Sequence, residues 1–221
     1  MRQIDSTDLK APIIVCDRHR IGCDGQGITT LVVFRGCPLR CRYCINPFTF
    51  APDTKARDMT PAQLYEKVKI DDLYFLATGG GITLGGGEPL LYPDFIRAFL
   101  AECPEQWHIC VETSLSVPWE NVAKVAELVD VFYIDCKDAD PEIYHRYTGG
   151  DNRRMLENVE NLLTVIPPER IIMRLPLIPS FNTQEDRAKS RAVFEKMGIT
   201  QFDEFTYQLP QLLQHRTEHS S

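Results

Sequence analysis

Short apolar runs alternate along this chain with longer amphipathic stretches. The apolar runs are rich in β-branched and aromatic residues and cover 31–34, 81–84, 108–114, 131–137, 170–178 and 202–208. Apolar residues at helical spacing mark the stretches between them, at 60–73, 93–103, 118–128, 153–165 and 184–197. Because parallel strands need a crossover connection, this alternation predicts a parallel sheet. We therefore expect an α/β protein, an incomplete (β/α)6 barrel similar to a TIM barrel.

The residues that flank these stretches predict where helices begin and end. Thr60-Pro61 places a capping hydroxyl before a proline in the first turn, and Gly198 suits the end of helix 184–197. The first helix is expected to bury Leu64, Val68 and Leu73. At 221 residues the chain is long enough for one full hydrophobic core. We expect one core domain over 1–208, followed by a short helix and tail over 209–221.

The composition is that of an ordinary globular protein, with 43% hydrophobic and 25% charged residues. A net charge of −7 argues against a nucleic-acid partner, because phosphate binding needs a cationic face. No stretch approaches the roughly 18 apolar residues of a membrane span, and the N-terminus lacks the apolar run of a signal peptide. We therefore expect a cytoplasmic protein without a membrane partner. In that compartment its eight cysteines are expected to be metal ligands or buried thiols.

Polar clusters follow the ends of the predicted strands, where barrels of this class carry their chemistry. The first cluster is GCPLRCRYCIN, in which Cys37, Cys41 and Cys44 have the spacing C-x3-C-x2-C. Three thiolates on one loop can bind three irons of a cubane cluster and leave the fourth iron open. The alternatives are a zinc site or buried thiols, but structural zinc prefers four protein ligands, and no second pair lies at the usual spacing. The loop therefore predicts a [4Fe–4S] cluster on these cysteines.

With Tyr43 before its last cysteine, this loop resembles the signature of the radical S-adenosylmethionine superfamily. Residues 21–46 are similar to the opening of the activating enzymes of glycyl radical enzymes, such as the pyruvate formate-lyase activator, and weaker similarity continues through residue 208. The resemblance implies that the amino acid end of S-adenosylmethionine chelates the open iron. One electron from a reduced flavodoxin or ferredoxin then cleaves the sulfonium to methionine and a 5′-deoxyadenosyl radical, which abstracts a hydrogen atom from the substrate.

The resemblance also implies cofactor-binding residues at the ends of the other strands. GGGEP follows strand 81–84, where glycines let the backbone approach a ligand, and the family binds the amino group of S-adenosylmethionine with this loop. Asp135 and Lys137 lie two apart on one strand and so point to the same side. The alternatives are a flexible turn for GGGEP and salt bridges for the charged residues. The cofactor-binding residues implied are Tyr43, Ile45, Gly86, Gly87, Glu88, Glu112, Asp135, Lys137, Arg174 and Gln208.

Two positions depart from the family pattern. The family carries aspartate where this chain has Glu112, a residue of the implied monovalent-cation site. That site consists of Glu112, Thr113, the Tyr133 carbonyl and Asp135. Gln208 stands where the pyruvate formate-lyase activators carry histidine. Its amide can bond a ribose hydroxyl or a carboxylate, but it cannot change charge.

Other residues have weaker functional interpretations. Cys16 and Cys23 flank His19, but auxiliary clusters of the activators use cysteines in an insertion after the first motif, and residues 45–60 contain none. We therefore expect no second cluster. The small buried residues expected are Cys103, Cys110 and Cys136. The segment DGQG (24–27) resembles a family loop at the mouth of the barrel, with a plain turn as the alternative.

The favoured function is the formation of a radical on a backbone glycine of a partner, a glycyl radical enzyme. An incomplete barrel leaves a lateral opening that could accept a protein loop. One alternative keeps the radical chemistry but acts on a small molecule or a ribosomal peptide. Another is a non-catalytic electron-transfer or scaffold protein that carries a cluster. GGGEP and the Asp-Cys-Lys run at 135–137 argue against the latter, since an electron carrier needs no cofactor-binding barrel.

Overall fold

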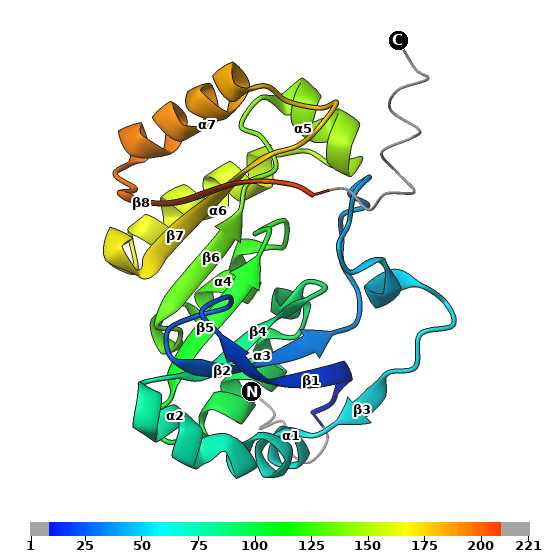
Figure 1. Cartoon of the computed structure of the whole chain (residues 1–221), viewed down its shortest axis with the longest axis vertical. Helices are drawn as coiled ribbons and strands as arrows, with labels where there is room; N and C mark the ends of the chain where they lie inside the picture. Colours follow the sequence, from blue (N-terminus) through cyan, green and yellow to red (C-terminus); the bar gives the residue numbers. More distant parts are fainter. Residues whose placement is uncertain (1–8, 209–221) are drawn as a thin grey trace.

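The computed structural model describes residues 9–208, whose strands form one eight-stranded sheet (Figure 1). The strand order in the sheet is β3-β1-β2-β4-β5-β6-β7-β8. The parallel strands are β2 (Ile28–Phe34), β4 (Gly81–Gly86), β5 (His108–Thr113), β6 (Val131–Asp135), β7 (Ile171–Leu177) and β8 (Gln201–Thr206). Each coincides with a predicted strand, so the incomplete (β/α)6 barrel is confirmed. The predicted helix and tail at 209–221 lie outside the described residues.

The sequence pattern does not predict two antiparallel strands at one edge of the sheet. β1 (Ala11–Ile21) pairs with β2, and β3 (Arg57–Met59) pairs with the first residues of β1. The second half of β1 is polar and partly exposed, and its pairing is irregular near His19, whose φ is 58°. An irregular polar edge strand and a three-residue strand show no apolar alternation that would identify them.

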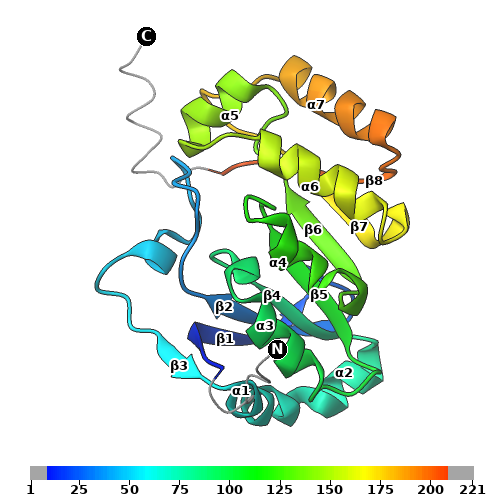
Figure 2. The same cartoon turned by 180° about the vertical axis from the view of Figure 1, so that it is seen from behind.

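Helices cover the face of the sheet that is turned toward the viewer in Figure 2. The α-helices are α1 (Pro61–Val68), α2 (Asp72–Thr78), α3 (Pro93–Leu100), α4 (Trp119–Ala123), α5 (Pro141–Thr148), α6 (Arg153–Leu163) and α7 (Gln184–Met197). The 3-10 turns are η1 (Pro47–Phe50), η2 (Lys69–Asp71), η3 (Pro89–Leu91), η4 (Ala126–Leu128) and η5 (Pro168–Arg170). Between residues 9 and 208, no helix has both the length and the apolar character needed to cross a membrane.

The predicted helix boundaries hold where local capping decides them. α7 begins after Thr183, whose hydroxyl accepts from the Asp186 N–H while the Asp186 carboxylate accepts from the Thr183 N–H. It ends at Gly198, which has a φ of 99°. Thr60 and Gln63 form the same reciprocal cap at the start of α1. Such caps depend on neighbouring residues only, and so they can be identified from the sequence.

The prediction of one helix over 60–73 is wrong, because the chain turns at η2. Asp71 is fully buried there and accepts hydrogen bonds from Arg18 Nε at 2.8 Å and Thr30 Oγ1 at 2.9 Å. These bonds tie the turn to β1 and β2, and α2 starts afresh with Phe75 as its buried residue. Leu73 is consequently 75% exposed rather than buried.

α5 is a helix that the periodicity of apolar residues does not reveal. Its start is nonetheless marked in the sequence, because the Asp140 carboxylate caps the N–H groups of Glu142 and Ile143, and Pro141 occupies the first turn. Gly149 ends it at a φ of 73°. The predicted helix over 118–128 is in fact the short α4 followed by η4.

The hydrophobic core lies between the sheet and the helices. It combines outward-facing strand residues with the apolar faces of the helices, including Val32, Leu84, Val111, Phe132, Met173, Phe95, Phe99, Leu162 and Phe194. Cys136 and Ile134 are buried with this set, as the alternation along β6 predicts. Asp135 and Lys137 therefore face the inside of the barrel together, where their side chains pair.

The expectation that the DGQG loop borders the mouth of the barrel is wrong. Residues 22–27 join the end of β1 to the start of β2, at the amino ends of the parallel strands and opposite to the cysteine loop. The Thr83 hydroxyl donates to the Asp24 carbonyl, and Gln26 Nε2 donates to the Gly79 carbonyl at 2.9 Å. A Cβ on Gly25 would stand only 3.2 Å from Cys110 Sγ. The loop thus forms the floor of the barrel.

Two leucines on neighbouring helices test this description of the core. Leu64→Ala should lower the free energy of unfolding by about 2–5 kcal/mol, because Leu64 is fully buried and truncation leaves a cavity. Leu73→Ala should change it by no more than about 0.5 kcal/mol, because this side chain is mostly exposed. Urea unfolding of the cofactor-free proteins measures both values. Equal losses would show that one continuous helix buries both side chains.

Candidate active site

A cavity of about 290 Å³ opens where the carboxyl ends of the parallel strands meet. It takes residues from the loop after β2, from the glycine loop after β4, and from β5, β6, β7, β8 and the segments that follow them. All predicted cluster-binding and cofactor-binding residues except Tyr43 line it: Cys37, Cys41, Cys44, Ile45, Gly86, Gly87, Glu88, Glu112, Asp135, Lys137, Arg174 and Gln208. Residues from 37 to 208 thus meet at one end of the barrel, as its topology requires.

Main-chain hydrogen bonds hold the cysteine loop across the end of the barrel. The Arg40 N–H donates to the Thr148 carbonyl and the Arg42 N–H to the Tyr147 carbonyl, both at 3.0 Å. These contacts tie the loop to the end of α5, which lies beside it in Figure 1. The Cys44 N–H donates to the Cys41 carbonyl and closes a turn within the loop. The position of Cys41 therefore depends on a helix about a hundred residues further along the chain.

The three thiols suit a cluster better than a single metal ion. Burial raises the pKa of Cys37 to about 12 and also raises the pKa of Cys41, where the charge of Lys137 opposes the shift. Metal binding must therefore displace protons from these thiols. Among residues 9–208, no three His, Cys, Asp or Glu side chains converge on one ion. Thiolates that bind separate irons of a cubane need not converge, so this donor set fits a [4Fe–4S] cluster with one open iron.

The glycine loop lies against the cysteine loop. The Gly87 N–H donates to the Phe34 carbonyl at 3.2 Å, and the Glu88 N–H donates to the Gly36 carbonyl at 2.8 Å. Asn46 Nδ2 donates to the Gly86 carbonyl at 3.2 Å. A Cβ on Gly87 would collide with the Gly36 carbonyl oxygen, so only glycine permits this approach. GGGEP is therefore a fixed turn that shapes the cavity, not a flexible one.

The Glu88 carboxylate is hydrogen-bonded within the protein. Its side chain is fully buried, and its two oxygens accept from Thr113 Oγ1, Ser114 Oγ, the Ser114 N–H and the Leu90 N–H at 2.7–3.2 Å. Burial raises the pKa of Glu88, while the four donors oppose that shift by favouring the ionised form. A carboxylate has about four acceptor positions. The protein thus fills these positions, and Glu88 holds the glycine loop to β5.

Lys137 places a buried positive charge at the cavity wall. Its ammonium lies 3.2 Å from the Asp135 carboxylate and donates to the Tyr207 hydroxyl at 3.0 Å. Burial alone would lower the pKa of Lys137, but the charge of Asp135 raises it well above the ordinary lysine value. Lys137 therefore remains cationic at physiological pH. Lys137 thus forms the predicted salt pair with Asp135 and also lines the cavity.

Arg174 likewise lines the cavity and forms salt bridges. Its guanidinium contacts Glu112 at 2.7 Å and Asp203 at 3.6 Å, and it lies over the Tyr133 ring, 4.6 Å from the centroid. Glu112 is therefore neutralised by a protein cation, and the Thr113 hydroxyl is bonded to Glu88. With both side chains so engaged, the geometry gives no support to the implied monovalent-cation site.

Two tyrosines near the cysteine loop differ in their relation to the cavity, and the sequence interpretation misses one of them. Tyr43 does not line the cavity; its ring packs against Phe181 and Tyr147, with centroids 5.4 and 6.1 Å away. Tyr147 itself does line the cavity, and it comes from α5, the helix that periodicity does not reveal. The other lining residues beyond the implied set are Leu39, Asn46, Thr113, Ser114, Phe205, Thr206 and Tyr207.

The remaining cysteines take no part in this cavity. All eight cysteines are free thiols. Cys110 and Cys136 are buried, as expected, whereas Cys103 is only partly buried. Cys23 is exposed and Cys16 packs partly against the core. Within residues 9–208, these five cysteines do not cluster with other His, Cys, Asp or Glu side chains around a common point.

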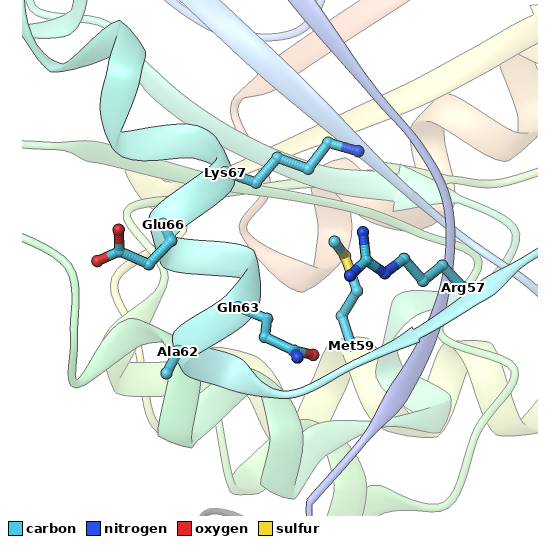
Figure 3. A pocket seen from close by; sticks show the side chains of 6 residues that line it. All are labelled: Arg57, Met59, Ala62, Gln63, Glu66 and Lys67. Carbon is cyan, nitrogen blue, oxygen red and sulfur yellow. The ribbon is translucent and has the colours of Figure 1, made fainter.

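Another hollow, of about 470 Å³, lies between β3 and α1 and shares no lining residue with the cysteine cavity. Figure 3 shows its side chains: Arg57, Met59, Ala62, Gln63, Glu66 and Lys67. They include charges of both signs but no cysteine or histidine. This hollow therefore lacks the groups that the cysteine cavity offers for metal or radical chemistry.

The structural role of Glu88 can be tested without any cofactor. Glu88→Gln should lower the free energy of unfolding of the cofactor-free protein by about 1–3 kcal/mol. The substitution replaces one acceptor oxygen by an NH2 group, which cannot accept the hydrogen bonds of the donors that surround Glu88. Urea unfolding under anaerobic, reducing conditions measures the change. Glu66→Gln is the control, since its ion pair with Lys69 is exposed and its loss should leave stability nearly unchanged. An unchanged stability of Glu88→Gln together with weaker S-adenosylmethionine binding would assign the carboxylate to the ligand.

Sequence comparisons agree with this geometry. Residues 31–190 match the Radical SAM superfamily model. The chain is 27% identical to the indoleacetate decarboxylase activating enzyme of Tractidigestivibacter scatoligenes, over 85% of each protein. It is 31% identical to the pyruvate formate-lyase-activating enzyme of Staphylococcus aureus, over 74% of this chain and 67% of that enzyme. The first alignment spans 269 positions, more than the 221 residues here, so that relative contains segments that this chain lacks.

Solved structures share the architecture at lower identity. Streptococcus suis SuiB bound to S-adenosylmethionine superimposes with a TM-score of 0.61 at 17% identity, over 82% of this chain and 43% of SuiB. This similarity concerns the fold alone. The family match over more than half of the chain establishes that this protein belongs to the radical SAM superfamily, whose cofactors are a [4Fe–4S] cluster and S-adenosylmethionine.

Proposed function

We propose that this chain is an activating enzyme that forms a glycyl radical in a partner enzyme. The observation that carries the proposal is the cavity that Cys37, Cys41 and Cys44 share with Lys137, in a chain whose relatives are named activating enzymes. When bound, the cluster and S-adenosylmethionine supply a 5′-deoxyadenosyl radical that can abstract a hydrogen atom from a glycine Cα. Side chains and loops of this chain bind and position these cofactors.

The proposed roles follow from charge and position. Cys37, Cys41 and Cys44 would hold the cluster through three of its irons and leave one iron open for S-adenosylmethionine. Lys137 offers a fixed positive charge to the carboxylate of S-adenosylmethionine, and the Gly86–Gly87 backbone allows a close approach. The remaining cofactor contacts are assigned to Ile45, Asp135, Arg174 and Gln208, all of which line the cavity. Because Asp135 pairs with Lys137 and Arg174 pairs with Glu112, these charged groups are held in place before a ligand binds.

The open side of the barrel supports a protein substrate. Within residues 9–208, β3 and β8 are the two edges of the sheet and do not pair with each other. A flexible loop that carries a glycine could reach the cavity from this side, whereas a closed barrel would admit small molecules only. This access favours the activase over the small-molecule alternative.

We assign the electron donor to an acidic carrier, a flavodoxin or a ferredoxin. Arg40 and Arg42 flank Cys41 and are exposed, as is Lys55, although the chain as a whole carries a net charge of −7. A local basic surface beside the cluster would attract such a carrier and orient it for electron transfer. A cytoplasmic, anaerobic setting would keep the free thiols reduced and would preserve the radical.

The cleavage step can be tested with purified protein that has been reconstituted anaerobically with iron and sulfide. Dithionite or a reduced flavodoxin should drive the formation of 5′-deoxyadenosine from S-adenosylmethionine. Cys41→Ala should lose the cluster and this activity, because a ligand is removed. Cys103→Ala, at a partly buried thiol outside the cavity, should retain both and change stability only. Equal iron content and turnover in wild type and Cys41→Ala would exclude the proposed site.

The substrate assignment needs the partner itself. Candidates are glycyl radical enzymes whose genes lie beside the gene for this chain. Incubation of such a partner with the reduced enzyme and S-adenosylmethionine should produce a glycyl doublet in electron paramagnetic resonance spectra. A chain that forms 5′-deoxyadenosine but gives no doublet with such partners would be a radical SAM enzyme with another substrate.

A further inference from the structure

One buried polar atom of a cavity-lining residue has no hydrogen-bond partner of standard geometry among residues 9–208. The Tyr147 side chain is 1% exposed, and its hydroxyl is the buried side-chain polar atom that lacks a partner among residues 9–208. Leaving a buried hydroxyl unpaired costs free energy, and proteins rarely accept this cost without a functional reason. The Tyr147 hydroxyl therefore needs a hydrogen-bond acceptor that residues 9–208 do not provide.

The residues around Tyr147 indicate the chemical character of the acceptor that its hydroxyl needs. Its ring packs against Phe181, Tyr43 and Tyr207, at centroid distances of 5.0, 6.1 and 6.4 Å, so the aim of the hydroxyl is fixed. Cys41 and Lys137 lie close enough to influence its pKa. Its own carbonyl accepts from the Arg42 N–H in the cysteine loop. Tyr147 thus lines the cavity together with a cluster-binding thiol and a fixed cation, and a cation favours an anionic acceptor there.

The Tyr207 hydroxyl is the protein group to consider as a partner. Its contact with the Tyr147 hydroxyl is close enough for hydrogen bonding to contribute to the raised pKa of Tyr147, but the two hydroxyls do not meet the geometry of a hydrogen bond. The Tyr207 oxygen accepts from Lys137 with good geometry instead. Burial raises the pKa of Tyr147 far above the physiological range. The group is therefore a neutral phenol that can donate one hydrogen bond.

We propose that Tyr147 is a cofactor-binding residue whose hydroxyl donates a hydrogen bond to an anionic atom of the bound cofactors beside Cys41 and Lys137. This inference rests on the proposed cluster site. Two atoms share the required chemistry: a sulfur of the cluster at Cys41, and a carboxylate oxygen of S-adenosylmethionine. A hydrogen bond to a cluster sulfur favours the reduced, more negative cluster and raises its reduction potential. A hydrogen bond to the carboxylate strengthens S-adenosylmethionine binding instead.

Tyr147→Phe and Tyr144→Phe form a matched pair on α5. Both tyrosines are buried, but the Tyr144 hydroxyl is 3.0 Å from the Ser116 hydroxyl and hydrogen-bonded to it. In the cofactor-free protein, Tyr147→Phe should raise the urea midpoint of unfolding, because it removes an unpaired polar atom. Tyr144→Phe should lower the midpoint, because it breaks a bond and leaves Ser116 without this partner. A lowered midpoint for Tyr147→Phe would show that the hydroxyl has a protein partner and would overturn the proposal.

The reconstituted proteins separate the two acceptors. A redox titration without S-adenosylmethionine, followed by electron paramagnetic resonance, should give a more negative midpoint potential for Tyr147→Phe if the acceptor is a cluster sulfur. An unchanged potential with roughly tenfold weaker S-adenosylmethionine binding, the effect of one lost hydrogen bond, would identify the carboxylate. Tyr144→Phe should change neither quantity. An intact cluster in Tyr147→Phe with unchanged potential and affinity would overturn this inference and leave the proposed function standing, whereas a wild type that assembles no cluster would overturn the proposed function.

Discussion

The main-chain hydrogen bonds that join the loops at the carboxyl ends of the strands are the constraint on which the site depends. Irregular loops have no repeating pattern that satisfies their N–H groups, so each group needs a specific partner. Here the glycine loop bonds to the segment after β2, and the cysteine loop bonds to the end of α5. Three segments far apart in the sequence thereby fix one another. The spacing of the cysteines alone would not determine where their thiols point.

Compensation of buried charges is the second organising feature. Lys137 pairs with Asp135, Arg174 pairs with Glu112, and Glu88 is surrounded by four donors. An unpaired charge at such depth would be costly, because the protein interior solvates ions poorly. A structural salt bridge and a role in ligand binding are therefore compatible at these positions. The pairing holds each charge in place, and a ligand that enters the cavity meets an arrangement that is already formed.

The barrel is closed at one end and open at its side. The loop at 22–27 packs against the inside at the amino ends of the strands, where a Cβ on Gly25 would contact Cys110. Within residues 9–208 the two edge strands of the sheet do not pair with each other. A substrate must therefore approach from the carboxyl ends or through the lateral opening. In this arrangement a radical made at the cysteine loop would be reached by a partner segment without any passage through the core.

Local pattern determines much of this protein. The six parallel strands, the capped ends of α1 and α7, and the inward direction of Asp135 and Lys137 all follow from apolar periodicity, capping residues and strand alternation. The cysteine spacing and its flanking residues likewise predict the superfamily and its cofactors. Each of these features depends on residues that are neighbours along the chain.

Tertiary contacts decide the rest. Asp71 breaks a predicted helix because it bonds to residues of β1 and β2, and Glu88 is committed to β5 although its motif suggests a ligand contact. The position of Tyr147 depends on a helix whose apolar pattern is weak and on aromatic contacts with segments before and after it. Sequence determines which groups the chain possesses and how each segment is shaped. Which donor meets which acceptor is decided only when distant segments pack together, because hydrogen-bond partners and burial are properties of the folded whole.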